Sequence, residues 1–237
     1  MAGKIDHTAH TVKSYDEELK HLVNTIARMG GLAEAQLAGA IQAVAKRDSD
    51  LAGRVVAGDP KVDELEQEVQ KQVVRLLALR QPVAIDLRNI VVALKISSDI
   101  ERIADYAANV AKRAIVLAEL SPVKPVAVVP RLGRLAQTII RDVLDAYVER
   151  DKEKALAVWN SDEEVDEMYT SMFRELVTYM MEDPRNITAC THLMFIAKNI
   201  ERIGDHATNI AESIHFLIEG QPIRGKRPKG SMLTTPR

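Results

Sequence analysis

One segment of this chain occurs twice, and that duplication limits the possible folds more than any other feature. IERIADYAANVA begins at Ile100, and IERIGDHATNIA begins at Ile200. Other matches come earlier in each copy, since VDE at residues 62–64 recurs at residues 165–167. The sequence therefore predicts a duplicated unit of about 100 residues, with the same helices in both copies.

The first copy has the apolar periodicity of three helices. From residue 15 to residue 47, apolar side chains recur at spacings of three and four, as on one face of a helix. Gly30-Gly31 weakens the middle of that helix by about 1 kcal/mol per glycine. A second helical region at 49–80 is expected to kink or restart at Asp59-Pro60, because Asp suits a cap and Pro suits a first turn. A third helix is expected at 84–119.

The second copy follows a proline-rich segment. SPVKPVAVVP has three prolines in ten residues, which cannot lie inside a helix and therefore predict a linker. Only 4% of the residues are aromatic, and a core of Ala, Val, Leu and Ile favours helices over sheets. The expected fold is all-α, with six long helices in two elongated three-helix bundles. In the second copy the helices are expected at 131–149, 152–181 and 186–219.

These expectations divide the chain into four parts. The last part is polar, basic and rich in Gly and Pro, and it is interpreted as a flexible tail. The parts are a first three-helix bundle at 1–120, a Pro-rich linker at 121–130, a second three-helix bundle at 131–219 and the basic tail at 220–237.

Composition and motifs exclude several classes of protein. The net charge of −2 gives no general attraction to nucleic acid. The single cysteine, Cys190, precludes an intrachain disulfide and fits a reducing cytoplasm. The sequence has no run of about 18 apolar residues that would span a membrane. It also lacks Gly-x-Ser-x-Gly, Cys-x-x-Cys and glycine-rich nucleotide loops, so the protein is expected not to be an enzyme.

The duplicated segment places acidic side chains one helical turn apart. Glu101 and Asp105 are four residues apart, and Asn109 follows after another four. On a helical wheel they form a diagonal row beside the apolar face, toward a groove or solvent. Two like charges at this spacing destabilise an isolated helix slightly. The second copy repeats the row with Glu201, Asp205 and Asn209.

The preceding helix of each copy carries the same acidic spacing. If consecutive helices are antiparallel, the two rows of carboxylates face each other. Convergent carboxylates bind hard cations, and di-iron and di-manganese sites in helical bundles are built in this way. The alternative is a solvated acidic face, which duplication alone would also repeat. The residues on the preceding helix are Asp59, Asp63, Asp162 and Asp166.

The segments that carry these motifs are similar to those of a known family. AIDLRNIVVALKISSDIERIADYAANVAK at 84–112 and IAKNIERIGDHATNIAESI at 196–214 closely resemble the PhoU family. The resemblance continues in SYDEELKHL, MGGLAEAQL and VDELE. It implies two three-helix bundles related by pseudo-symmetry, and some members of the family bind multinuclear iron or zinc clusters through E(D)xxxD motifs.

The resemblance also assigns residues to the expected metal sites. Iron or zinc is the expected metal ion, with manganese and magnesium as alternatives. Pro60 departs from a regular helix and affects the geometry of the carboxylate beside it. The E(D)xxxD motifs correspond to Glu101, Asp105, Glu201 and Asp205, with Asn109 and Asn209 extending them, and the paired motif corresponds to Asp59, Asp63, Asp162 and Asp166.

For function, the resemblance implies a negative regulator of the phosphate starvation (Pho) regulon and of phosphate uptake. It would link the PstB-like ATPase subunit of the phosphate ABC transporter to a PhoR-like sensor histidine kinase. A cytoplasmic homodimer is expected, held at the inner face of the membrane by these partners. Two alternatives stay open: a metal-dependent hydrolase or redox enzyme, and a metal-free helical interaction protein. Metal-dependent turnover would favour the first alternative, and absence of bound metal the second.

Overall fold

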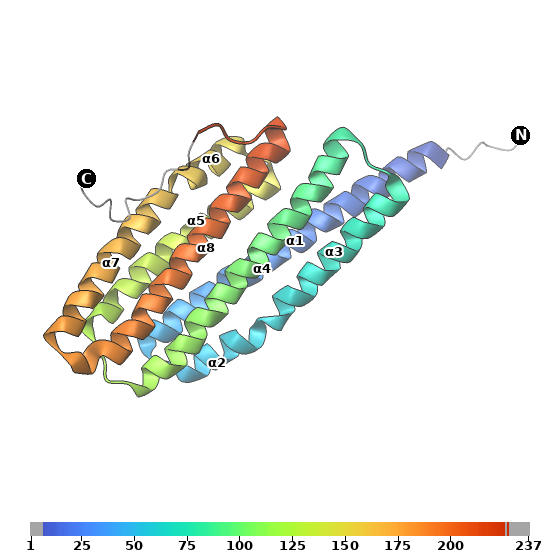
Figure 1. Ribbon diagram of the computed structural model, residues 1–237. Helices are drawn as coiled ribbons and strands as arrows, with labels where there is room; N and C mark the ends of the chain where they lie inside the picture. Colours follow the sequence, from blue (N-terminus) through green and yellow to red (C-terminus); the bar gives the residue numbers. More distant parts are fainter. Residues whose placement is uncertain (1–6, 226, 228–237) are drawn as a thin grey trace, which may run out of the picture.

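The duplicated units form two sets of helices with matching order (Figure 1). The computed structural model describes residues 7–225 and 227, with backbone only for 7–14, 125 and 126. Within this part of the chain all regular structure is helical, which confirms the predicted all-α fold. The first half consists of α1 (His7–Lys46), α2 (Ser49–Gly58), α3 (Pro60–Arg80) and α4 (Ala84–Glu119). The second consists of η1 (Lys124–Val128), α5 (Val129–Glu149), α6 (Lys152–Asn160), α7 (Asp162–Glu182), η2 (Pro184–Asn186) and α8 (Ile187–Glu219).

Equivalent residues make the turn after the first helix of each half. Arg47 and Arg150 both adopt the left-handed conformation, with φ of 55° in each case. The aspartate that follows then caps the next helix, as expected for a short acceptor side chain at this position. Asp48 Oδ1 accepts from the Leu51 N–H at 2.8 Å, and Asp151 Oδ1 accepts from the Lys154 N–H at 3.0 Å.

The second helical rod of each half is broken. The predicted restart at Asp59-Pro60 is confirmed, because α2 ends at Gly58 and Pro60 begins α3. The single helix expected at 152–181 is wrong, since it divides into α6 and α7 at Ser161. The Ser161 hydroxyl donates to the Val158 carbonyl at 2.8 Å, a local hydrogen bond of the kind that competes with helix propagation.

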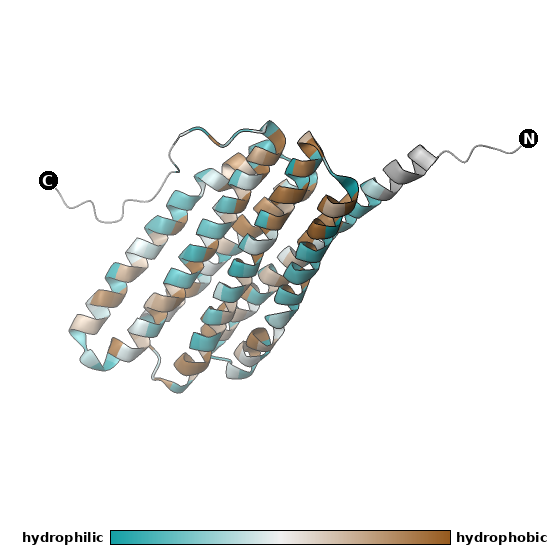
Figure 2. Ribbon diagram, turned by 45° about the vertical axis from the view of Figure 1, so that its right-hand side comes forward, coloured by the Kyte–Doolittle hydropathy of each residue, from teal (hydrophilic) through white to brown (hydrophobic). Residues whose placement is uncertain are grey.

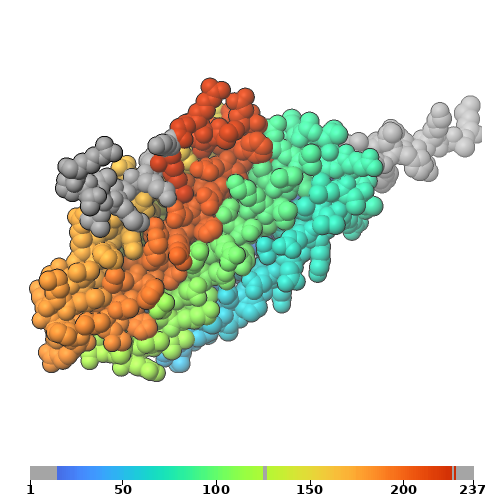
Figure 3. Space-filling view, viewed as in Figure 1, coloured from blue at the N-terminus to red at the C-terminus, as the bar shows by residue number. Residues whose placement is uncertain are grey.

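The last helices of the two halves, α4 and α8, lie antiparallel in the middle of the molecule (Figure 1). On the face seen in Figure 3, α7, α8, α4 and α3 follow one another as neighbouring rods. The arc predicted for the core of α4 is confirmed, because Ile96, Ile100 and Ile103 are buried. In α8 the equivalent Ile196, Ile200 and Ile203 are also buried, so both helices are central to the apolar core.

Two glycines allow the first helices of the halves, α1 and α5, to pack closely. A Cβ atom on Gly133 would lie 2.6 Å from the Ile41 side chain, and one on Gly30 would overlap the Leu144 side chain. The expected weak point at Gly30-Gly31 does not interrupt α1. Close packing of the apolar side chains offsets the low helix propensity of glycine at this point.

The segment between the halves is shorter than expected. Within the predicted linker at 121–130, residues 124–128 form the 3₁₀-helix η1, and α5 begins at Val129 rather than at residue 131. Pro130 occupies the first turn of α5, where its missing N–H removes no intrahelical hydrogen bond. The helices that the structure describes include none that is long and apolar enough to cross a membrane.

Candidate carboxylate sites

The acidic rows of the first half face each other. Asp59 and Asp63 lie at the start of α3, and Glu101 and Asp105 lie on α4. Because α3 and α4 are antiparallel (Figure 1), carboxylates of the two helices repel one another. This repulsion raises the pKa values of Asp59 and Glu101. These four residues and Glu66 are called the first carboxylate cluster below. The structure thus brings together the predicted residues of this half, Asn109 excepted.

Glu101 responds most directly to this crowding. Its pKa is raised to about 7, first by burial and then by the negative charge of Asp105. The positive charge of Arg102 opposes the rise, whereas Glu66 and Asp63 add to it. At neutral pH the Glu101 carboxyl is therefore close to half protonated, and a cation beside it would displace the proton.

Asp59 lies in a similar environment at the junction between α2 and α3. Burial raises the pKa of its carboxyl, and the charges of Asp105 and Asp63 raise it further. Asp59 Oδ1 is buried and makes no hydrogen bond of normal geometry among the described residues, although the nearby Gln36 side chain lowers the pKa of this carboxyl. A buried oxygen in this state has an unused site for a water molecule or a cation.

Cations of the chain itself compensate this cluster only partly. Arg102 lies 3.6 Å from Glu101 Oε2 and 3.4 Å from Asp105 Oδ2, but 56% of its side chain is exposed. Solvent weakens such a contact considerably. The Lys112 ammonium donates to Asn109 Oδ1 at 3.5 Å. Asn109 therefore lies beside a lysine, and its role as a metal ligand stays a prediction.

The corresponding residues of the second half are called the second carboxylate cluster. They are Asp162 and Asp166 at the start of α7, and Glu201 and Asp205 on α8. The expectation that the α8 row faces a groove or solvent is wrong for Glu201, which is only 5% exposed, whereas Asp205 and Asn209 are partly exposed. On α7, Asp162 and Asp166 are buried as well, at 2% and 7% exposed. The Thr208 hydroxyl donates to Asp162 Oδ1 at 3.4 Å, which links α8 to the start of α7.

A lysine within α8 balances part of this buried charge. Lys198 Nζ lies 2.7 Å from Glu201 Oε2, as its spacing of three residues in the sequence predicts. Burial raises the pKa of Glu201, while the hydrogen bond from Lys198 lowers it and the charge of Asp205 raises it again. Burial and repulsion together outweigh the lysine.

An arginine from the C-terminal segment enters the same cluster. Arg227 Nη2 lies 2.6 Å from Asp162 Oδ1 and 2.9 Å from Asp205 Oδ1, and only 15% of the arginine side chain is exposed. Arg227 belongs to the segment interpreted above as a flexible tail, and residues 226 and 228–237 of that segment lie outside the described part. The sequence analysis did not predict this contact, because a basic composition does not show which acidic side chains the basic residues will contact.

A polar contact between the halves was also missed. Asp99 on α4 is 8% exposed, and its Oδ1 lies 2.8 Å from His206 Nδ1 on α8. Asn209 Nδ2 donates to the same oxygen at 3.5 Å, so this predicted ligand lies at the contact between the halves. One sequence signal was available: Asp99 precedes IER in the first copy, just as Asn199 does in the second, and both are buried.

The donor atoms in both clusters are oxygens, which suit a hard cation such as magnesium, manganese or iron and also bind zinc. The buried Asp59 Oδ1 and the raised pKa of Glu101 are consistent with a cation in the first cluster. In the part of the chain that the structure describes, no three His, Cys, Asp or Glu side chains are grouped closely enough to hold a metal ion. Side chains of the cluster would have to reorient around a bound ion.

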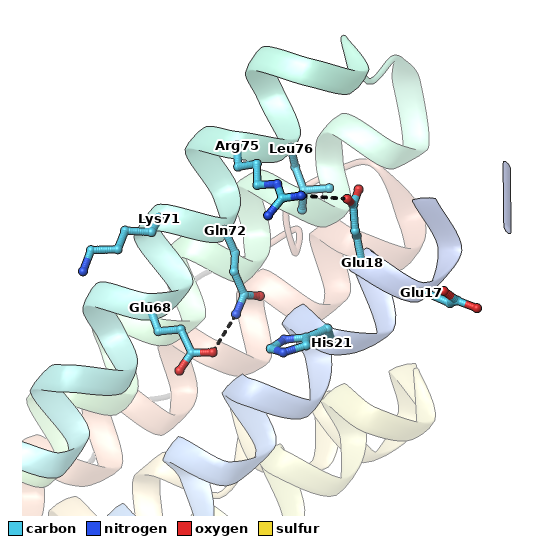
Figure 4. Close-up of a pocket in the computed structure, with 8 residues that line it drawn as sticks. All are labelled: Glu17, Glu18, His21, Glu68, Lys71, Gln72, Arg75 and Leu76. Atoms are coloured by element: carbon cyan, nitrogen blue, oxygen red, sulfur yellow. Dashed lines mark hydrogen bonds and ion pairs between the residues drawn. The ribbon is translucent and has the colours of Figure 1, made fainter. Parts of the chain in front are cut away.

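A separate groove of about 470 Å³ lies between α1 and α3 (Figure 4). Glu18 and Arg75 form an ion pair of 3.9 Å across it, and Gln72 donates to Glu68 Oε1 at 3.0 Å. Figure 4 shows His21 at its wall. None of the predicted site residues lines this groove, so the carboxylate clusters and the groove are different features.

Comparison with known proteins gives consistent matches over both halves. The family described as "PhoU domain" matches residues 26–114 and 129–214. The "Phosphate-specific transport system accessory protein PhoU homolog" of Caulobacter vibrioides (strain NA1000 / CB15N) is 55% identical, over 96% of this chain and 99% of the relative. The homolog of the same name in Rhizobium meliloti (strain 1021) is 47% identical, over 96% of each chain.

Two solved structures have the same arrangement of helices. The crystal structure of PhoU from Pseudomonas aeruginosa is 40% identical, with a TM-score of 0.84 over 87% of this chain and 100% of that chain. The crystal structure of the phosphate transport system regulatory protein PhoU from Streptococcus pneumoniae is 27% identical, with a TM-score of 0.82 over 88% and 99% of the two chains.

Proposed function

Because the chain belongs to the PhoU family, we propose that it is a non-enzymatic accessory protein of a phosphate transport system that represses the phosphate starvation response. The observation that carries this proposal is the 55% identity, over nearly the full length of both chains, to a relative named as an accessory protein of phosphate-specific transport. The Streptococcus pneumoniae structure is named as a regulatory protein, which supports the regulatory part.

An adaptor of this kind acts by binding other proteins. We assign it two partners: the ATPase subunit of the phosphate ABC transporter and a sensor histidine kinase. Binding to these partners would hold a cytoplasmic protein at the inner face of the membrane. Its output would depend on the conformation of the transporter, since a partner that binds one state better shifts the equilibrium toward that state.

Exposed apolar side chains support a role in protein–protein contact. Several lie at the end of the molecule where α3 meets α4, and Figure 2 shows this end as hydrophobic. Exposed apolar side chains gathered at one place are typical of interaction surfaces. We call these residues the apolar end, and they are Val74 at 66%, Leu79 at 66%, Val83 at 75%, Ile85 at 61% and Val91 at 51% exposed.

The ATPase subunit is the occupant that we propose for the apolar end, because the relatives are named for a transport system. Val83→Glu with Ile85→Glu should abolish co-purification of the purified ATPase subunit, while Met181→Glu at another exposed position should not. Unchanged co-purification would place the contact elsewhere. If size-exclusion chromatography shows that the double variant loses dimerisation and keeps the ATPase, the surface binds a second copy instead.

The carboxylate clusters are the proposed metal sites. In the first cluster Asp59, Asp63, Glu101 and Asp105 would hold the cation, and in the second Asp162, Asp166, Glu201 and Asp205 would do so. A bound cation supplies positive charge between carboxylates that repel one another. The chain's own residues then bring α3 and α4, or α7 and α8, into a fixed register. The proposed role is structural and regulatory, without turnover.

A gene deletion tests the regulatory role. Deleting the gene should raise expression from a phosphate-regulon promoter in phosphate-rich medium, and the full-length gene should restore repression. Complementation with Glu101→Gln plus Asp105→Asn then asks whether the first cluster is required. Unchanged reporter output in the deletion strain would contradict the proposed function, whatever the metal content of the protein.

The metal-free alternative is favoured by one observation, the pairing of Arg227 with Asp162 and Asp205 in the second cluster. Elemental analysis of protein purified without a chelator or affinity tag separates the two possibilities. Iron or zinc that is lost in the Asp105→Asn variant would support the metal sites. Protein free of metal, with unchanged melting after iron or zinc is added, would leave a regulator without metal.

A further inference from the structure

The two carboxylate clusters share four equivalent acidic positions but differ in their cations. The second cluster has the Arg227 guanidinium bridging Asp162 and Asp205, from α7 and α8. Among the described residues, the cations near the first cluster are the exposed Arg102 and the more distant Lys112. The difference arises because the duplicated unit ends before Arg227, which therefore has no counterpart in the first half.

The Arg227 guanidinium lies between carboxylates of two helices, at the position where a bound cation would balance their charge. It brings one positive charge to carboxylates from two helices, which is the arrangement that a bound metal ion would produce. Asp162 is 2% exposed, and its Oδ2 has no hydrogen-bond partner among the described residues. One oxygen of this buried carboxylate thus binds the guanidinium while the other retains capacity for a ligand.

The contact is built in a way that allows exchange. Nη2 makes both ion pairs, while the buried Nε of Arg227 has no hydrogen-bond partner among the described residues. A buried donor without a partner costs free energy, which reduces the net stabilisation that the docked arginine provides. Six residues separate Arg227 from Gly220, where α8 ends, and within them Ile223 packs against the apolar core.

The same segment passes the only tryptophan of the chain. Pro222, Ile223, Gly225 and Arg227 line a cavity of about 320 Å³ together with Trp159. Trp159 Nε1 donates to Glu212 Oε1 at 3.1 Å, so the ring is held in place by α8. Undocking of the segment would expose this face of the indole to water, and fluorescence would report the change.

We propose that the C-terminal segment is a built-in competitor of the second carboxylate cluster, in which Arg227 and a divalent cation exclude each other. Cation binding releases the segment, and docking of the segment keeps the second cluster free of metal. The inference rests on the proposed metal sites and makes the two clusters unequal: the first binds the cation directly, and the second must first displace an arginine.

The test compares Zn²⁺ binding by full-length variants, using isothermal titration calorimetry and Trp159 emission. All variants carry Glu101→Gln and Asp105→Asn, which removes the first cluster as a binding site. The protein with these two substitutions and an intact Arg227 is called the parent. Arg227→Gln should bind Zn²⁺ about tenfold more tightly than the parent, because in the parent only the fraction of molecules without a docked Arg227 can bind Zn²⁺. Arg224→Gln is the matched control, since this exposed arginine contacts Gln221 at 3.5 Å and neither carboxylate cluster.

Fluorescence provides a second readout that does not depend on affinity. Without metal, Arg227→Gln should shift Trp159 emission to longer wavelength, and Arg224→Gln should not. Zn²⁺ should shift the parent toward the emission of Arg227→Gln and should leave Arg227→Gln itself unchanged. Emission that does not respond to Arg227→Gln would overturn the docked state of the segment.

The outcomes separate this inference from the proposed metal sites. Arg227→Gln and the parent could bind Zn²⁺ with equal affinity while Asp162→Asn loses the binding. This result would overturn the competition and leave the second metal site in place. Absence of Zn²⁺ binding in every variant, including protein with an intact first cluster, would overturn both the metal sites and the competition. Tighter binding in Arg227→Gln together with the emission shift would support the inference.

Discussion

Asp99 Oδ1 on α4 lies 2.8 Å from His206 Nδ1 on α8, and this pair connects the two copies of the duplicated unit across their central contact. Both side chains are largely buried, at 11% and 22% exposed. The Tyr106 ring packs against the same histidine, with ring centroids 5.6 Å apart. The contact between α4 and α8 therefore includes polar side chains beside its apolar core, and Arg113 Nη1, 3.4 Å from His192 Nδ1, adds a second such contact.

The Asp99–His206 pair should contribute measurably to stability. Asp99→Ala and His206→Ala should each lower the free energy of unfolding by about 1 to 3 kcal/mol, because each leaves a buried partner unsatisfied. The double variant should lose less than the sum, with a coupling of about 1 kcal/mol. Urea unfolding of the four proteins measures this cycle. Additive losses would contradict it, and Lys95→Ala on the exposed side of α4 is the control.

Glu101 should make stability depend on pH. Its pKa rises from 4.5 in the unfolded chain to about 7 in the folded protein, so the folded state binds the proton more tightly. The stabilisation from this proton is complete at acidic pH and is lost as the pH rises through about 7. Glu101→Gln should therefore be more stable than wild type at pH 8 by about 1 to 2 kcal/mol, a value reduced for partial exposure.

The measurement is thermal and urea unfolding at pH 4 and pH 8. At pH 4, below the unfolded pKa of 4.5, the two proteins should be nearly equally stable, because the carboxyl that glutamine replaces is largely protonated in both the folded and the unfolded state. Glu64→Gln, at an exposed position of α3, is the control and should behave as wild type at both pH values. A Glu101→Gln protein that is less stable than wild type at pH 8 would show that the carboxylate is not destabilised there.

The same proton should appear in metal binding by the first cluster. In an Asp162→Asn background, which disables the second cluster, Zn²⁺ affinity should fall about tenfold per pH unit below pH 7, because one proton must leave Glu101. Calorimetry in buffers of different ionisation enthalpy counts the released proton. Glu101→Gln should bind more weakly and lose this pH dependence. An equally steep dependence in the variant would assign the proton to another group.

Equivalent core residues of the two copies should have similar importance. Ile100 and Ile200 are 1% and 0% exposed at the start of the duplicated segments. Replacement of either by Ala should lower the free energy of unfolding by about 2 to 5 kcal/mol, because a cavity remains in the packed core. Val91→Ala, at a position that is 51% exposed, should change stability by much less. Equal small losses for all three would mean that the core relaxes around the deletions.

The periodicity of the sequence was sufficient to predict the helices, because apolar spacing along a helix depends only on local geometry. Ile96, Ile100 and Ile103 are buried as expected, and the restart at Pro60 occurs where proline allows it. The break at Ser161 was not predicted. The Ser161 hydroxyl donates to the Val158 carbonyl at this point, a local hydrogen bond that apolar periodicity does not reveal.

The candidate sites were likewise predicted from the sequence only in part. Repetition of Glu101 and Asp105 as Glu201 and Asp205 identified the acidic rows, because residues four apart share one side of a helix. The burial of the second row and the approach of Arg227 depend on contacts between segments far apart in the chain. Those contacts follow from how segments far apart in the chain pack together. The tertiary structure alone therefore decided that the second cluster binds the distant Arg227, whereas the first cluster contacts Arg102 of its own helix.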